Sequence, residues 1–208
     1  MINNNTLQSI KEQVSNFPKC ELMIVTKNRS VEDIQQLLNQ GFCLFGENRV
    51  QEAKFKYQVI KKNYQLHLIG PLQSNKVRVA LKLFDTIQTV SSIKLVDLID
   101  KELKKNEIFR TKSFYIQVNI GAENQKSGVN EKNVIELFEY AKNKQLNIKG
   151  LMCIPPFDKD PLFFFEKMLT IRDQVDQGLN LSMGMSNDYE IALKCSSNMV
   201  RIGSKIFL

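Results

Sequence analysis

The stretch ELMIVTKNRSVEDIQQLLNQG (21–41) joins a short apolar run to an amphipathic run, and the rest of the chain repeats this unit. Residues 21–27 are largely apolar up to a terminal lysine, which is typical of a strand buried on both faces. Helical spacing follows at Val31, Ile34, Leu37 and Leu38, and Gly41 ends the helix pattern. A buried strand followed by a helix predicts one unit of a parallel sheet.

Seven further apolar runs are strand candidates, at 43–48, 67–70, 86–90, 113–120, 148–154, 179–184 and 200–203. Helix patterns separate them at 50–62, 74–84, 92–105, 130–144, 161–176 and 187–195, and one extra helix is expected in front at about 5–16. Eight strands alternating with helices predict an α/β protein, a closed (β/α)8 TIM barrel that forms a single domain over 1–208. An open doubly wound sheet is the alternative, weakened because the turn after the first strand carries no GxGxxG pattern.

The composition is that of a globular protein, with 43% hydrophobic and 25% charged residues among 208. The apolar runs are too short to cross a bilayer, and the polar start MINNNTLQSIKEQ has no signal-peptide core. We therefore expect a cytoplasmic protein with no membrane partner. The formal net charge is +7, but the lysines are scattered among Asp and Glu, which favours solvated helix faces over a nucleic-acid surface.

The four cysteines show no CxxC spacing and the chain has one histidine, so a structural zinc site is not expected. Cys43 and Cys153 lie in apolar segments, and we expect both to be buried free thiols.

The chemistry of a parallel barrel lies at the carboxyl ends of its strands, and Lys27 ends the first one. A charged ammonium is costly to desolvate at a barrel mouth, and its neutral form is the amine that attacks an aldehyde. The alternative is a lysine whose stem lies on apolar surface while its charge reaches water, and position alone favours that alternative.

Two turns near the C-terminus are suited to a phosphate. SMGMSNDYE (182–190) leads from a strand into a helix whose first amides are unpaired, and in VRIGS (200–204) Gly203 and Ser204 allow close approach of backbone N–H groups. Arg201 is placed to contact a ring nitrogen or a phosphate. The alternatives are a helix cap at Ser186 and an ordinary ion pair of Arg201. Because strands 7, 8 and 1 are neighbours in a barrel, the pattern is consistent with one phosphorylated aldehyde.

Two further polar residues lie at the ends of strands 2 and 3. Asn48, within FGENRVQE (45–52), is placed to hydrogen-bond a ligand edge. His67 begins or lies within strand 3, where a lone histidine is more often structural than catalytic.

Six motifs in order carry a family resemblance from about residue 21 to the end of the chain. They are FGENRVQE (45–52), HLIGPLQSNK (67–76), QVNIGAENQKSG (117–128), KGLMCIPP (149–156), LSMGMSNDYE (181–190) and MVRIGSKIF (199–207). These motifs resemble the YggS/PROSC family of pyridoxal phosphate (PLP) homeostasis proteins. The resemblance implies the barrel of fold type III PLP proteins, similar to the N-terminal domain of alanine racemase.

The same resemblance implies site residues. It places PLP as an internal aldimine on Lys27, with Arg201 facing the pyridine nitrogen. The remaining contacts that it implies are Ser182, Gly203 and Ser204 at the phosphate, Met183 and Ser186 close by, and Asn48 and His67 near the ring.

The implied function is PLP homeostasis without catalytic turnover. A guanidinium stays protonated, so Arg201 would not protonate the ring and make it a strong electron sink. A racemase also needs a second acid/base, which its relatives draw from a further domain that this sequence does not show. The alternative is a minimal amino-acid racemase or lyase. We expect a monomer, with PLP as ligand and PLP-dependent apoenzymes as candidate recipients.

The sequence departs from the family at two places. The family reads VSKTxP around its lysine, whereas this chain reads Val25-Thr26-Lys27-Asn28-Arg29-Ser30 and lacks the proline. The family's WHFIG has Leu66 in place of the tryptophan. Lys126 also matches a family lysine, and we interpret it as a surface or secondary-site residue.

Overall fold

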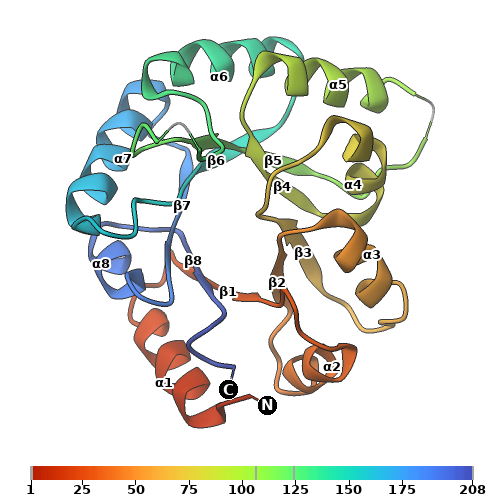
Figure 1. Cartoon of the computed structure of the whole chain (residues 1–208), viewed down its shortest axis with the longest axis vertical. Coiled ribbons are helices and arrows are strands. Elements are labelled where there is room, and N and C mark those ends of the chain that lie inside the picture. Colours follow the sequence, from red (N-terminus) through yellow and green to blue (C-terminus); the bar gives the residue numbers. More distant parts are fainter. Residues whose placement is uncertain (1, 106, 124, 208) are drawn as a thin grey trace.

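The eight expected strands form one closed parallel barrel with helices around it (Figure 1). The computed structural model describes residues 2–207 except 106 and 124. The strands are β1 (Glu21–Val25), β2 (Leu44–Glu47), β3 (Gln65–Leu68), β4 (Thr86–Val90), β5 (Ser113–Val118), β6 (Ile148–Cys153), β7 (Asn180–Met185) and β8 (Met199–Ile202). They pair in sequence order, and β8 closes the ring on β1. The predicted TIM barrel is therefore confirmed.

The helices follow the predicted alternation. They are α1 (Asn4–Ser15), α2 (Val31–Asn39), α3 (Val50–Tyr57), α4 (Val77–Leu83), α5 (Ile93–Leu103), α6 (Val134–Asn143), α7 (Pro161–Val175) and α8 (Tyr189–Lys194). Short 3-10 turns precede α4 at Ser74–Lys76 and α6 at Glu131–Asn133. The extra helix, α1, lies between α8 and α2 and completes the outer ring (Figure 1). None of the helices in the described part of the chain is long and apolar enough to cross a membrane.

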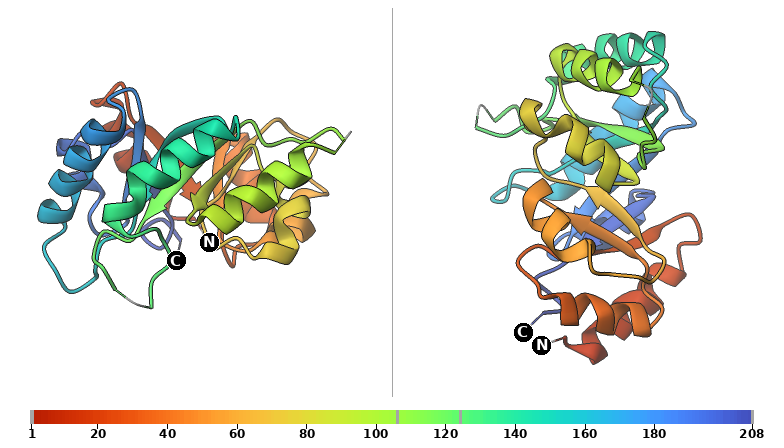
Figure 2. Two further views of the ribbon diagram at one scale, coloured as in Figure 1. Left: turned by 90° about the horizontal axis from the view of Figure 1, so that it is seen from above. Right: turned by 90° about the vertical axis from the view of Figure 1, so that its right-hand side faces the viewer.

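The two ends of the described chain meet beside α1. Ile2 and Phe207 form an antiparallel bridge, and the N–H of Asn3 donates to the carbonyl of Ile206 at 2.8 Å. Figures 1 and 2 show the start of α1 and the segment after β8 side by side. Backbone hydrogen bonds therefore join the first and last segments of the barrel.

Alternation along each strand decides which side chains face the barrel interior. On β1, Met23 and Val25 belong to the inner apolar cluster, whereas Ile24 packs outward against the helices. Continuing the period of two, Thr26 faces α3 and Lys27 faces the mouth of the barrel. Lys27 thus faces the barrel mouth because it lies an even number of residues after Met23, which faces inward.

Two of the cysteines were expected to be buried, and one of those expectations is wrong. Cys153 is fully buried at the end of β6, as predicted, whereas Cys43 is exposed. Cys43 precedes β2, which begins one residue later, so it does not take part in the buried alternation of the strand.

Gly70 lies just beyond β3, where the backbone of Asn48 passes very close. A Cβ at Gly70 would lie 2.1 Å from the carbonyl oxygen of Asn48, a backbone atom that cannot turn aside as the end of a flexible side chain could. We predict that Gly70→Ala lowers the free energy of unfolding by about 2 to 3 kcal/mol, because the two segments must separate. Urea unfolding measures this. Gly178→Ala, whose Cβ would meet only a side-chain oxygen of Asp176 at 3.2 Å, is the control and should stay within about 0.5 kcal/mol of wild type. Equal losses in the two variants would contradict the prediction.

Candidate functional site

A cavity of about 630 Å³ opens at the carboxyl ends of the strands, within the usual size range of small-molecule sites. Its walls come from the ends of β1, β6, β7 and β8, which are neighbours in the ring. The lining residues that carry polar chemistry are Lys27, Lys126, Lys159, Ser186, Asn187, Asp188, Arg201, Gly203 and Ser204. Of the nine residues proposed from sequence, this cavity brings together Lys27, Ser186, Arg201, Gly203 and Ser204.

Lys27 reaches this cavity with an exposed side chain. The burial on which the desolvation argument depended is therefore absent. The loop that follows Lys27 nevertheless has a defined conformation. Asn28 adopts a left-handed backbone with φ of 57°, and the guanidinium of Arg29 stacks on the ring of Phe207 at 4.4 Å.

The two turns after β7 and β8 are tied together by one hydroxyl. Ser186 Oγ accepts the backbone N–H groups of Gly203 and Lys205, both at 3.3 Å. Within the described chain, no acceptor takes the N–H groups of Ser186, Asn187 and Ser204, all of which line the cavity. Free N–H groups on residues that line one hollow are suited to bind an anion.

Arg201 is a buried cation that has no carboxylate within ion-pair distance among the described residues. Its side chain donates to Ser182 Oγ and to the carbonyl of Cys153, both at 2.8 Å. Burial lowers the pKa of the Arg201 guanidinium, and the neighbouring charge of Asp188 acts in the opposite direction. The group nevertheless stays protonated at neutral pH. A buried charge without a counter-ion is costly, so an anionic or electron-rich ligand in the adjoining cavity would stabilise it.

A chain of hydrogen bonds continues from Arg201 across the barrel interior. Ser182 Oγ donates to Gln88 Oε1 at 2.7 Å, and Gln88 Nε2 donates to His67 Nδ1 at 2.9 Å. The neutral imidazole therefore carries its proton on Nε2. Burial lowers the pKa of His67 to about 4, with a small opposing effect from Asp85. Ser182 and His67 thus support Arg201 from below instead of lining the cavity.

Gln88 was missed by the sequence analysis. The signal available was a glutamine in the middle of a strand whose other residues are all β-branched, where a buried amide requires partners. Those partners lie on β3 and β7, 21 and 94 residues away in sequence, so spacing could not reveal them.

Met183 and Asn48 lie away from this cavity. Met183 is fully buried in the outward core beneath the helices, and its neighbour Met185 lines the cavity instead. Alternation along β7 explains why Ser182 faces inward and Met183 faces outward. The register shift between Ser182 and Met185 interrupts that alternation, which allows Met185 to line the cavity. Asn48 lines an adjacent hollow of about 260 Å³ with Gly70, Gln117 and Lys126. The two hollows share Lys126 and Ile154, so Asn48 faces the other half of the mouth.

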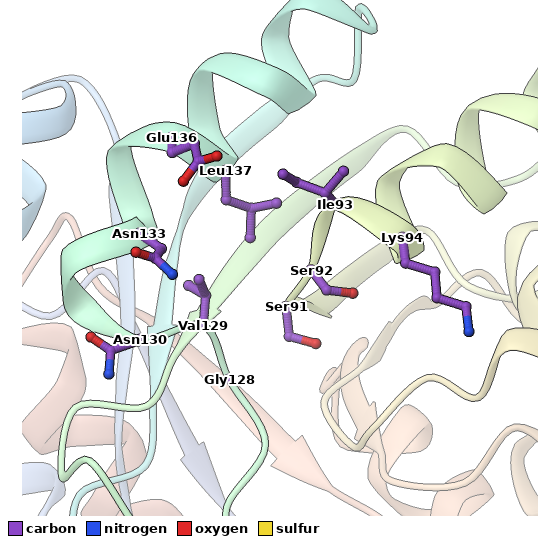
Figure 3. A pocket seen from close by; sticks show the side chains of 10 residues that line it. All are labelled: Ser91, Ser92, Ile93, Lys94, Gly128, Val129, Asn130, Asn133, Glu136 and Leu137. Carbon is purple, nitrogen blue, oxygen red and sulfur yellow. The ribbon is translucent and has the colours of Figure 1, made fainter.

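A separate hollow of about 410 Å³ lies between the starts of α5 and α6 (Figure 3). It is lined by Ser91 and Ser92 on one side and Asn130 and Asn133 on the other, and Lys94 and Glu136 lie on opposite sides of it. None of the predicted site residues reaches it. Within residues 2–207, leaving out 106 and 124, no three His, Cys, Asp or Glu side chains are grouped to hold a metal ion.

The fold defines the class of this protein, a closed (β/α)8 barrel of the type also found in alanine racemase. An alanine racemase of Clostridium difficile superposes with a TM-score of 0.76 over 98% of this chain and 56% of the racemase. Its sequence identity is only 16%, so this likeness shows the fold alone. PipY of Synechococcus elongatus, solved without PLP, is 29% identical, with a TM-score of 0.88 over 98% of this chain and 99% of PipY. PipY with PLP bound superposes with a TM-score of 0.82.

Curated relatives then identify the family. The pyridoxal phosphate homeostasis protein of Aquifex aeolicus is 35% identical over 97% of this chain and 92% of its own length. That of Haemophilus influenzae is 37% identical over 95% of this chain and 88% of its own length. No family model matches the sequence. This chain belongs to the pyridoxal phosphate homeostasis protein family, and the resemblance seen in its motifs is confirmed.

The lowered pKa of His67 makes stability depend on pH. An unfolded chain binds a proton on its histidine near pH 6.5, whereas the folded chain resists protonation down to about pH 4. The contribution of His67 to the free energy of unfolding is therefore complete above pH 6.5. It is lost as the pH falls towards 4, which lowers the free energy of unfolding by up to about 3 kcal/mol. We predict that His67→Asn, which keeps an acceptor for Gln88, flattens this part of the profile.

Urea unfolding of wild type and His67→Asn between pH 4 and 7 tests this. The chain has one histidine, so the difference between the two profiles isolates it from the carboxylates that titrate in the same range. Parallel profiles would show that His67 is not held neutral.

Proposed function

We propose that this protein binds PLP reversibly through Lys27 and thereby helps to control the free PLP of the cell. One observation carries the proposal. A single cavity combines an accessible amine at Lys27, a buried and unpaired guanidinium at Arg201, and the free N–H groups of two turns. An aldehyde, an aromatic ring nitrogen and a phosphate are the groups that these three features recognise, and PLP carries all of them.

The residues present fit each part of the ligand. The phosphate would accept the N–H groups of Ser186, Asn187 and Ser204, in charge-assisted hydrogen bonds. Gly203 keeps this turn close to β1, since a Cβ there would lie 3.2 Å from Cβ of Val25. Arg201 would face the ring nitrogen, held in place by Ser182, Gln88 and His67.

Lys27 would supply the covalent link. Its Nζ would be the nucleophile for the aldehyde carbon, and the aldehyde oxygen would be released as water when the imine forms. The step is reversible, so water or another amine can release the ligand. When bound, PLP would supply the electrophilic carbon and a visible absorption band.

We propose that the protein holds PLP without catalytic turnover. The titratable residues that line the cavity are four cations and Asp188. Asp188 Oδ1 accepts the N–H of Met185 at 2.5 Å and so is committed to the turn after β7. A guanidinium that keeps its proton leaves the ring a weaker electron sink. The relatives that share most of this chain are named for homeostasis, whereas the racemases share only the fold.

We also propose that residues 1–208 act as one domain in the cytoplasm, with PLP-dependent apoenzymes as recipients. The bridge between Ile2 and Phe207 supports the single domain, because it joins the first and last segments of the described chain.

The first test is the site of attachment. Wild-type protein incubated with PLP should gain a visible band that disappears on borohydride reduction, leaving a stable adduct on the peptide that contains Lys27. Lys27→Ala should lose the band and the adduct on that peptide, because the amine that forms the link is removed. Lys149→Ala, which removes an exposed lysine at the start of β6, is the control and should behave as wild type. A colourless wild-type protein, or an adduct on a different peptide, would contradict the proposal.

The second test separates a carrier from an enzyme. A racemase or lyase would exchange the Cα hydrogen of an amino acid with solvent deuterium. We predict no exchange above the rate of free PLP across a panel of amino acids, measured by mass spectrometry in deuterated buffer. Exchange that requires Lys27 would establish the enzyme instead.

A further inference from the structure

A buried ion network lies directly behind Lys27, on the side away from the cavity. Lys56 of α3 forms ion pairs with Glu47 Oε1 at 2.5 Å and with Glu52 Oε1 at 2.8 Å. The side chains of Lys56 and Glu47 are 5% and 0% exposed. Such a network is costly to bury unless its members gain further hydrogen bonds.

Those further bonds go to the backbone around Lys27. Lys56 Nζ donates to the carbonyl of Thr26 at 2.7 Å, and Glu52 Oε1 accepts the N–H of Asn28 at 2.5 Å. The first group belongs to the peptide that enters Lys27 and the second to the peptide that leaves it. The cation and the carboxylate of one ion pair therefore hold both peptide groups of the lysine.

Thr26 adds a third anchor. Its hydroxyl donates to Glu47 Oε1 at 2.6 Å and lies 2.9 Å from the hydroxyl of Tyr57. Because Thr26 and Lys27 point in opposite directions, tying Thr26 to α3 turns the next side chain towards the mouth.

The backbone that follows Lys27 also depends on this network. Here Asn28 takes a left-handed conformation at φ of 57°, and Arg29 and Ser30 follow. Left-handed backbone is costly for a residue other than glycine, so outside contacts such as that of Glu52 are needed to hold it.

We propose that Glu52 and Lys56 are positioning residues for Lys27, and that formation of the covalent link with PLP depends on the hydrogen bonds that they form with the two peptide groups of Lys27. This inference rests on the proposed function. Lys56 itself is occupied by three acceptors, Thr26 O, Glu47 and Glu52, so its amine is not available to the aldehyde. The network thus occupies the amine of Lys56 and leaves the amine of Lys27 free to react.

The test compares covalent attachment with binding alone. In Glu52→Ala, the rate of the borohydride-trapped adduct on Lys27 should fall on the order of 10-fold, since misplacing a reacting group slows its reaction. The affinity for pyridoxine phosphate, which carries an alcohol in place of the aldehyde and forms no imine, should stay within about twofold, because the phosphate turns are untouched. Glu52→Gln keeps an oxygen for the N–H of Asn28 and should restore most of the rate.

Asp100→Ala is the matched control. It removes another carboxylate paired with a lysine four residues on, at 2.8 Å, on α5 far from the mouth residues. This variant should change neither the rate nor the affinity. Should Glu52→Ala fail to fold, Glu52→Asp, which withdraws the carboxylate by one methylene, should give the same separation of rate from affinity.

A second readout needs no PLP. Hydrogen exchange of the Asn28 amide should be faster in Glu52→Ala than in wild type and unchanged in Asp100→Ala. Wild-type attachment rates in a folded Glu52→Ala, or equal losses of rate and of pyridoxine phosphate affinity, would overturn the inference alone. A wild-type protein that takes no PLP on Lys27 would instead overturn the proposed function, and the inference with it.

Discussion

The buried charge of Arg201 is the constraint around which the interior of this barrel is arranged. A guanidinium so far from water requires acceptors on several sides. Ser182 and the carbonyl of Cys153 supply two, and Gln88 and His67 keep Ser182 oriented. Five strands, β3, β4, β6, β7 and β8, contribute to this arrangement. These five strands supply no negative charge within ion-pair distance of Arg201. A ligand in the adjoining cavity would compensate the charge of the guanidinium.

The fold could be predicted from sequence because the alternation of short apolar runs and amphipathic helices is local. The run at 21–41 shows the pattern, the next six repeats each correspond to a strand and a helix, and β8 is the last strand of the order. Strand ends were less certain. The third strand was expected to begin at His67, but it begins at Gln65, which places Gly70 beyond it.

The site was predicted in part, and the strand register explains the difference. Lys27, Ser186, Arg201, Gly203 and Ser204 share one cavity because they follow neighbouring strands. Motif reading alone does not say how deep a residue lies or which way it points. Adjacent Ser182 and Met183 cannot both face a ligand, and the structure turns one inward and the other outward. The roles of Gln88 and Glu52 depend on partners distant in sequence, so they required three-dimensional coordinates.

The hydrogen-bond chain has a consequence for spectroscopy. It joins the guanidinium at the cavity to the one imidazole in the chain, through two neutral groups whose donors and acceptors are fixed. Because hydrogen bonds in a chain polarise one another, a change in charge at one end alters the hydrogen bond at the other end. The nitrogen resonances of His67 are therefore a built-in probe of what occupies the barrel mouth, read from a residue that does not line the cavity.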